Sequence, residues 1–170
     1  TVKVHGPLME EIEATYALSD DGKTAFMEMA AASGLPLVPP DKRNPMLTTT
    51  YGVGEMLLDA QRRGCQRVVM GIGGSATCDG GQGMIEAIGD KLPLEVIVAS
   101  DVDNPLYGKR GAAFIFAPQK GATPEQVVLL DQRLRDFARK TEREGWASPD
   151  LALHPGAGAA GGLGYALMAY

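Results

Sequence analysis

Hydrophobic and polar positions alternate near the N-terminus in a way that predicts β-strands. Between Glu11 and Leu18, apolar residues fall at every second position, and they alternate with the polar residues Glu11, Glu13 and Thr15. Because successive side chains of a strand point to opposite faces, this period is typical of a strand with one wet face. The sequence predicts three strands here, at residues 1–4, 11–18 and 24–29, with a hairpin turn at Asp20, Asp21 and Gly22 between the last two.

Later apolar segments predict two buried strands and several helices. Residues 67–70 and 95–100 are short continuous runs rich in β-branched side chains, which are typical of buried strands. Apolar residues at helical spacing predict helices at 56–62, at 84–89 and from 123 onward, whereas 112–117 fits a strand or a helix. The predicted fold class is α/β (mixed α+β), a single domain over residues 1–170 with glycine-rich strand–turn–helix units on a mixed sheet.

A glycine-rich segment, Gly71 to Gly83, separates a predicted strand from a predicted helix. Glycine permits close approach of a ligand to the backbone, and this arrangement aims main-chain N–H groups and a positive helix end at an anion. Ser75, Thr77 and Asp79 add two hydroxyls and a carboxylate to the same segment. A turn that only reverses the chain needs far fewer glycines, so we interpret the segment as a binding site.

Two named phosphate- and nucleotide-binding motifs resemble parts of this segment. It is not a P-loop, because no Gly-Lys-Ser or Gly-Lys-Thr follows. It does match Gly-x-Gly-x-x-Ala through Gly71, Gly73 and Ala76, and Asp101 ends a later apolar run where a dinucleotide-binding acid would lie, although further along than usual. A non-catalytic nucleotide- or dinucleotide-binding module is therefore the alternative function, and glycines that serve only packing are a third interpretation.

Polar residues also stand at the ends of other predicted elements. Thr49 and Thr50 precede a helix, where capping and a second anion-binding helix start are equally supported. Asp101 and Asp103 follow a predicted strand, and two carboxylates so placed favour Mg²⁺ over a simple Asx-type turn.

Three further residues have a simple explanation beside a functional one. Lys120, between a proline and a glycine, is displayed on a constrained loop and is a candidate phosphate ligand, although a loop lysine is usually only solvated. Gly158 lies in a second glycine-rich stretch, 155–164, where amides that bind a ligand compete with close packing. For Glu28 we favour a solvent-facing strand residue over a ligand.

Composition narrows the classes of partner. The formal net charge of -5 argues against a nucleic-acid surface, and the two cysteines, Cys65 and Cys78, fit a reduced compartment without metal spacing. Neither a signal peptide nor a long apolar run appears, so membrane and secretion have no support. The chain opens on Thr1 and stops at Tyr170 inside an apolar run, so we expect a piece of something longer.

The motifs occur together, and in this order, in one known family. They comprise 21–25, 28–35, 48–55, 71–84, 101–106, 118–123 and 155–162. On these motifs the chain resembles the bacterial type I glycerate kinases (the glycerate 2-kinase family). Members are about twice as long and have two α/β domains, so the chain resembles the inserted second domain, without the flanking first domain and with a segment missing between residues 90 and 91. Cys78 stands where asparagine or threonine is usual.

The resemblance implies a cytoplasmic enzyme that transfers a phosphoryl group from ATP, with Mg²⁺, to D-glycerate; 2-phosphoglycerate is the product we favour, and the sequence leaves 3-phosphoglycerate open. It further implies an active-site cleft shared with the missing first domain, so the isolated chain should be inactive. The oligomeric state stays open, and a homodimer is one candidate. Our hypothesis assigns phosphate or carboxylate binding to Gly73, Gly74, Ser75, Thr77, Gly80, Gly81, Thr49, Thr50 and Gly158. Asp79 would orient or deprotonate the hydroxyl, Lys120 would contact the transferring phosphate, and Asp101 with Asp103 would hold the metal.

Overall fold

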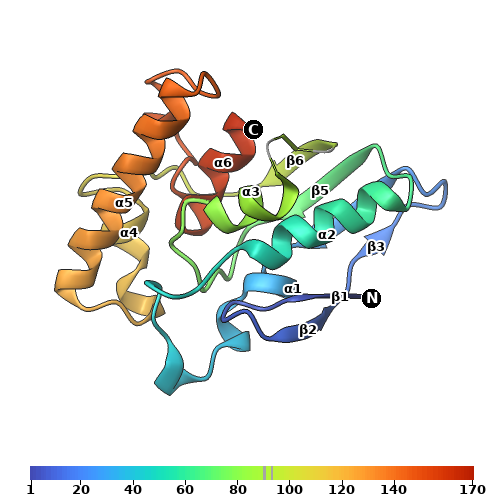
Figure 1. Cartoon of the computed structure of the whole chain (residues 1–170), viewed down its shortest axis with the longest axis horizontal. Coiled ribbons are helices and arrows are strands. Elements are labelled where there is room, and N and C mark those ends of the chain that lie inside the picture. The colour runs from blue at the N-terminus through green and yellow to red at the C-terminus, as the bar shows by residue number, and fades with distance from the viewer. Residues whose placement is uncertain (90, 93) are drawn as a thin grey trace.

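The computed structural model describes residues 1–89, 91–92 and 94–170. A small antiparallel pair of strands, β1 (Val2–His5) and β2 (Glu11–Ala14), stands beside a larger sheet (Figure 1). The larger sheet has the order β3-β4-β5-β6, built from β3 (Ala17–Leu18), β4 (Thr24–Glu28), β5 (Arg67–Gly71) and β6 (Glu95–Ala99). Strands β3 and β4 are antiparallel and the rest run parallel, which confirms the predicted α/β class with a mixed sheet.

The single strand predicted at 11–18 is wrong, because the chain changes sheets within it. Residues up to Ala14 pair with β1, whereas Ala17 and Leu18 pair with β4. Tyr16 lies between the two pieces, and its hydroxyl donates to Asp59 Oδ2 at 2.6 Å. Alternation gives the faces of a strand but not its partner, so the break was invisible in the sequence.

Helices cover one face of the larger sheet. The sheet packs against α2 (Tyr51–Arg62), α3 (Gln82–Ile88) and α6 (Leu163–Ala169), while α1 (Ala30–Ser33) follows β4 directly. Farther from the sheet lie α4 (Ala112–Phe116) and α5 (Pro124–Arg143). The 3₁₀ turns are Leu35–Leu37, Pro40–Lys42, Pro118–Lys120, Leu151–Leu153 and Ala159–Gly162.

Local start and stop signals explain the predicted helices. Helix α5 begins at the predicted residues, with Thr123 in a capping box with Gln126 and a proline in the first turn. Helix α3 ends before Gly89, as the glycine predicts. The ambiguous segment 112–117 is helical, because Ala112 and Ala113 bury their small faces against the α5 layer. In the described part of the chain, no helix is both long and apolar enough to span a membrane.

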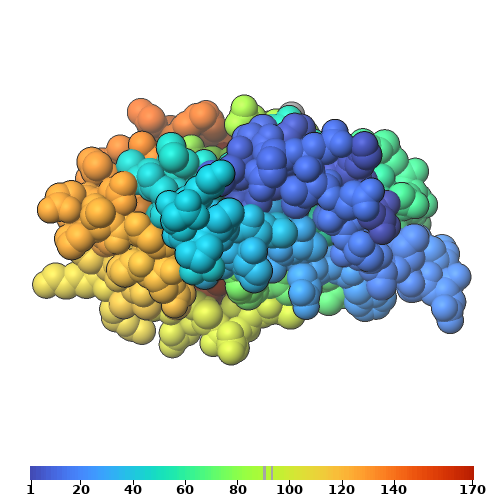
Figure 2. Space-filling model, turned by 90° about the horizontal axis from the view of Figure 1, so that it is seen from below, coloured from blue at the N-terminus to red at the C-terminus, as the bar shows by residue number. Residues whose placement is uncertain are grey.

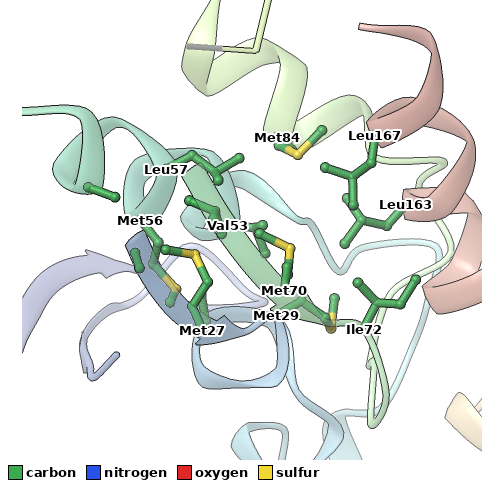
Figure 3. Close-up of a cluster of buried hydrophobic side chains, with 14 of the residues drawn as sticks. Met27, Met29, Val53, Met56, Leu57, Met70, Ile72, Met84, Leu163 and Leu167 are labelled. Atoms are coloured by element: carbon green, nitrogen blue, oxygen red, sulfur yellow. The ribbon is translucent and has the colours of Figure 1, made fainter. Parts of the chain in front are cut away.

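The buried side chains form two clusters. The first lies between the sheet and α2, α3 and α6, and is rich in methionine (Figure 3). Its labelled members are Met27, Met29, Val53, Met56, Leu57, Met70, Ile72, Met84, Leu163 and Leu167. The second lies around α4, α5 and Tyr165. Full burial of one such side chain contributes about 1.5–3 kcal/mol to stability. The segment from Ile72, in the first cluster, to Cys78, in the second, is therefore held by both.

The prediction that 95–100 is a buried strand is wrong in its burial. Strand β6 forms, but it is an edge of the larger sheet. Glu95, Ile97 and Ala99 are exposed, and Val96 and Val98 are only partly buried. The reason is that only one face of the sheet is covered by helices, and apolar composition does not tell a central strand from an edge. The junction of Asp90 and Lys91 falls partly outside the described residues.

Candidate functional site

The central glycine-rich segment forms a loop, residues 72–81, between β5 and α3, as predicted. Its first part is fastened to the start of the 3₁₀ turn at Leu35: Leu35 N donates to Gly74 O at 2.8 Å, and Ala76 N donates to Ser33 O at 2.9 Å. Ile72 belongs to the first core cluster and Cys78 to the second. The loop is therefore anchored at both ends rather than free to follow a ligand.

Two predicted ligand hydroxyls, Ser75 and Thr77, bond to each other. Their hydroxyl oxygens lie 2.9 Å apart, and Thr77 N donates to Ser75 Oγ at 3.0 Å. Thr77 is fully buried, whereas Ser75 is almost buried and lines a cavity. Ser75 is therefore the one of the two that a ligand can reach in this conformation.

Asp79 is the centre of a hydrogen-bond network that joins α2 to α3. It accepts four hydrogen bonds: from Gly81 N at 3.0 Å, Gly83 N at 3.1 Å, Thr50 N at 2.9 Å and Thr50 Oγ1 at 2.8 Å. Thr50 Oγ1 in turn accepts from Met84 N at 3.0 Å. The carboxylate thus satisfies the first amides of α3 from within the chain.

The threonines before α2 therefore act mainly through this network. Thr50 is the N-cap residue of α2, yet its side chain makes no capping bond to that helix. Thr49 does so instead, since its Oγ1 accepts from Tyr51 N at 3.1 Å. Both hydroxyls are engaged inside the chain: Thr49 bonds to the first amide of α2, as capping predicts, whereas Thr50 bonds to Asp79 and to Met84 of α3.

A groove opens where the parallel strands β5 and β6 end. It consists of two adjoining cavities of about 240 and 340 Å³, which share Ile72, Gly73, Val102 and Ala160. We call it the strand-end groove; its remaining lining is Leu35, Gly74, Ser75, Ala99, Ser100, Asp101, Phe116, Gln119, Lys120 and Ala159. This edge of an open α/β sheet is where ligands commonly bind.

Lys120 lies inside the protein rather than on a solvated loop. It ends the 3₁₀ turn Pro118–Lys120, is 4% exposed, and its Nζ donates to Thr77 O at 2.6 Å. Burial lowers the pKa of its ammonium to about 8. The simpler alternative, a solvated loop lysine, is therefore wrong, and the segment packs closely at Gly121, whose φ is 102 and whose neighbour is Arg43. Figure 2 shows the cyan 40–48 segment against the orange α5 side.

The second glycine-rich stretch packs on the first. A Cβ at Gly161 would strike Thr77 O, and Gly80 N donates to Gly161 O at 2.9 Å. Gly158 N donates to Asn104 O at 2.9 Å, so this amide is used for packing. Ala160 adopts φ 52, which is uncommon for alanine, and lines both cavities of the groove. The alanine and glycine letters alone gave no sign of this strained position.

The two candidate metal ligands are placed differently. Asp101 is exposed and lines the strand-end groove, whereas Asp103 is exposed outside its lining. Across residues 1–89, 91–92 and 94–170, no three His, Cys, Asp or Glu side chains gather as a metal site. Asp101 can still serve Mg²⁺, because that ion is usually held by one or two carboxylates together with substrate phosphates and waters.

The remaining predicted residues lie elsewhere. Thr49 and Asp79 line a separate cavity of about 630 Å³ between α3 and α5, whose wall includes Arg133, Lys140 and Arg143. We call it the helix groove. Gly80 N and Gly81 N have acceptors within the chain. The structure therefore divides the predicted site, and the strand-end groove keeps Gly73, Gly74, Ser75, Lys120 and Asp101.

Glu28 is an exposed residue at the end of β4, as we favoured. Its neighbour across the sheet is Gly71, the last residue of β5. With Tyr16 and Phe26 it lines a further cavity of about 510 Å³.

A groove at the carboxyl ends of parallel strands, with a buried ammonium in its wall, is typical of α/β proteins that bind an anionic small molecule. The sequence model of the glycerate kinase family matches this chain in two overlapping parts, residues 1–95 and 91–170. The chain therefore belongs to the glycerate kinase family.

Individual relatives agree with this assignment. The chain is 45% identical to a glycerate kinase of Halalkalibacterium halodurans, over 99% of this chain and 52% of that protein. It is 44% identical to glycerate 2-kinase of Escherichia coli K12, over 98% of this chain and 51% of that protein. A crystal structure of a candidate glycerate kinase 2 from Salmonella typhimurium LT2 superposes with a TM-score of 0.92 at 42% identity, covering 99% of this chain and 53% of that chain.

The chain thus spans about half the length of the relatives it matches. The alignment with the Halalkalibacterium protein is 200 residues long although this chain has 170 residues, so about 30 positions of that relative have no counterpart here.

Proposed function

We propose that this chain forms one wall of the active-site cleft of a cytoplasmic glycerate kinase, the other wall coming from the half of the relatives that it does not span. The reaction is attack of a D-glycerate hydroxyl on the γ-phosphorus of ATP. The new P–O bond forms as the bond to ADP breaks, the hydroxyl loses its proton, and the product is 2-phosphoglycerate. Such catalysis consists mainly of positioning and charge stabilisation, for which the strand-end groove supplies donors.

Free main-chain donors in the groove carry the proposal. Among the described residues, none accepts a hydrogen bond from the N–H of Gly73, Gly74 or Ser75. Lys120 contributes a desolvated ammonium to the same cavity. An anion bound there, phosphate or the glycerate carboxylate, would receive hydrogen bonds from the amides and a charge from Lys120.

Magnesium would be held at the outer end of this groove. Asp101, with Asp103 through water, would supply carboxylate oxygens, and ATP would supply the rest. The ion would neutralise charge on the phosphates. The surplus positions in the relatives' alignment, together with the two parts in which the family model matches, support a segment missing near residues 90 and 91.

In this proposal the main role of Asp79 is to hold the glycine-rich loop in place, and contact with the glycerate hydroxyl is secondary. Its four hydrogen bonds place Thr50, Gly81 and Gly83 around it. The strand-end groove is also stabilised by main-chain hydrogen bonds of residues that do not line it, namely Thr77, Gly80 and Gly158. Contact of Asp79 with the glycerate hydroxyl would require substrate to enter the helix groove, which it lines.

Calorimetric titration tests the binding step. ATP–Mg²⁺ and D-glycerate, added separately to this chain, should each release or absorb heat that saturates. Lys120→Met should weaken binding of one of them by at least about tenfold, while Lys109→Met, which removes an exposed lysine, leaves both affinities unchanged. No saturable heat from either ligand would overturn the proposal.

The alternative is a dinucleotide-binding module, favoured by one observation. Strand β5, the Gly71–Ala76 motif, α3 and the parallel β6 followed by Asp101 have the order of a dinucleotide-binding βαβ unit. Against it, the first amides of α3 are already occupied by Asp79. Saturable binding of NADH without binding of ATP–Mg²⁺ would establish the alternative instead.

Chain length makes a further prediction. Because one wall of the cleft should be absent, this chain alone should release no ADP above background when mixed with ATP, Mg²⁺ and D-glycerate. An assay that couples ADP to NADH oxidation measures this directly. Turnover by the chain alone would show that the site is complete without the other half of the relatives.

A further inference from the structure

Strand β6 is an open edge of the larger sheet. It contains the sequence Glu-Val-Ile-Val-Ala and lies at the end of the order β3-β4-β5-β6. Val96, Ile97 and Val98 have high strand propensity, and the strand carries neither a lysine nor a proline, while its one charged residue, Glu95, is ion-paired with Arg67 of β5.

The direction of its main-chain groups follows from one hydrogen bond. Glu95 N donates to Gln66 O at 3.2 Å, so the N–H and C=O groups of Glu95, Ile97 and Ala99 face β5. Those of Val96 and Val98 therefore point to the open side. Within the described ranges of the chain, no residue bonds to them there.

We propose that this edge pairs with β6 of a second copy of the chain, antiparallel about a two-fold axis at Ile97. In this register Val96 of one copy lies opposite Val98 of the other. Each such pair exchanges both N–H···O bonds, so the groups that are open in one chain are satisfied in two. The pairing joins two four-stranded sheets into one continuous sheet.

Side chains support the same register. The cross-strand row Phe26, Val69 and Ile97 lies on the face that no helix covers, with Phe26 48% and Ile97 45% exposed. Pairing at Ile97 extends this apolar row across the axis into the second copy. Glu95 falls opposite Ala99 of the second copy, so no like charges meet directly. Glu95 also keeps its ion pair with Arg67 at 2.8 Å.

Sedimentation velocity tests the proposal on the chain as it stands. The wild-type chain should show twice the 17.9 kDa mass of one chain. Ile97→Lys places like charges at the axis and should raise the dissociation constant of the dimer at least about tenfold. Val128→Lys, at an exposed position of α5, is the matched control and should leave the mass unchanged.

A mixture of variants gives the sharpest result. Ile97→Lys and Ile97→Glu should each be monomeric, because residue 97 of one copy lies opposite residue 97 of the other and like charges would meet. Mixing the two variants should restore a dimer, because opposite charges then meet at the axis. Val98→Pro removes an outward N–H without touching the bonds to β5 and should also dissociate the dimer. Circular dichroism checks that each variant is folded.

A monomeric wild-type chain at every concentration overturns the proposal. So does a dimer that persists in both Ile97→Lys and Val98→Pro, since the copies would then meet through another surface. The pairing concerns the exposed edge alone, so either result leaves the kinase assignment untouched.

Discussion

Lys120 shows how one buried charge makes the stability of the fold around the glycine-rich loop depend on pH. Its ammonium is enclosed, bonds to Thr77 O, and lies beside Cys78, whose thiol pKa is raised to about 11 by burial. A buried lysine with a lowered pKa is a common feature of sites that bind anions, because the ligand repays the desolvation of the charge.

The pKa of Lys120 predicts a dependence of stability on pH. The unfolded lysine has an ordinary pKa of 10.5 and the folded one about 8, so the unfolded chain binds more protons and its folded state gains stability as pH rises. Between about pH 7 and about pH 9, the wild type should gain about 1 kcal/mol relative to Lys120→Met. Urea denaturation of both proteins at the two pH values measures this difference. A constant difference would mean that the ammonium is not desolvated.

Asp79 predicts a large loss of stability on a small change. Asp79→Asn replaces an oxygen that accepts several N–H and O–H donors with a group that is itself a donor, so the unfolding free energy should fall by about 3 kcal/mol. Asp136→Asn, on the exposed face of α5, is the control. Equal stability of the two variants would remove Asp79 from its structural role.

At the scale of elements, the two glycine-rich stretches support each other through close backbone contact. Gly161 combines a positive φ with a neighbour, Thr77 O, that leaves no room for a side chain. Gly145 has a positive φ of 83 with open space around it. Comparing alanine substitutions at Gly145 and Gly161 therefore separates the strain of a left-handed alanine from the effect of a steric clash.

Gly161→Ala should therefore destabilise the chain much more than Gly145→Ala. Gly145→Ala should lower the unfolding free energy by about 1 kcal/mol, because alanine is strained only by the left-handed conformation. Gly161→Ala must also displace the loop at Thr77, so its unfolding free energy should fall by more than about 3 kcal/mol. Thermal unfolding of both variants compares them directly. Similar melting temperatures would show that the two stretches are not locked together.

Elements with local signals were predictable from the sequence. The capping box at Thr123, the glycine after α3 and the hairpin turn at Gly22 each depend on residues close in the chain. The split of 11–18 between two sheets and the edge position of β6 depend on distant partners, which alternation and composition do not encode.

The candidate site divides in the same way. The glycine-rich loop after β5 and Asp101 after β6 could be predicted, because the sequence indicates where these strands end. Both line the strand-end groove. The burial of Lys120, the buried Thr77 and the strained Ala160 depend on contacts between segments that are far apart in the sequence. No residue type at those positions signals such packing by itself.

At the scale of the whole molecule, this chain combines two buried clusters with a groove at the strand ends, which the proposed function makes one wall of an active-site cleft. Its fold matches the solved relative over 99% of its length, while half of that relative lies outside it. Ala99 belongs both to the proposed β6 pairing and to the lining of the strand-end groove, so the two surfaces adjoin at this residue.

The most direct test of the central claim is NMR of the ¹⁵N-labelled chain during titration with ATP–Mg²⁺ and D-glycerate. The strand-end groove predicts that the amide signals of Gly73, Gly74 and Ser75 shift most, because they are the free donors at the anion. Shifts concentrated instead at Gln82, Gly83 and Arg143 would place the ligand in the helix groove and contradict the account.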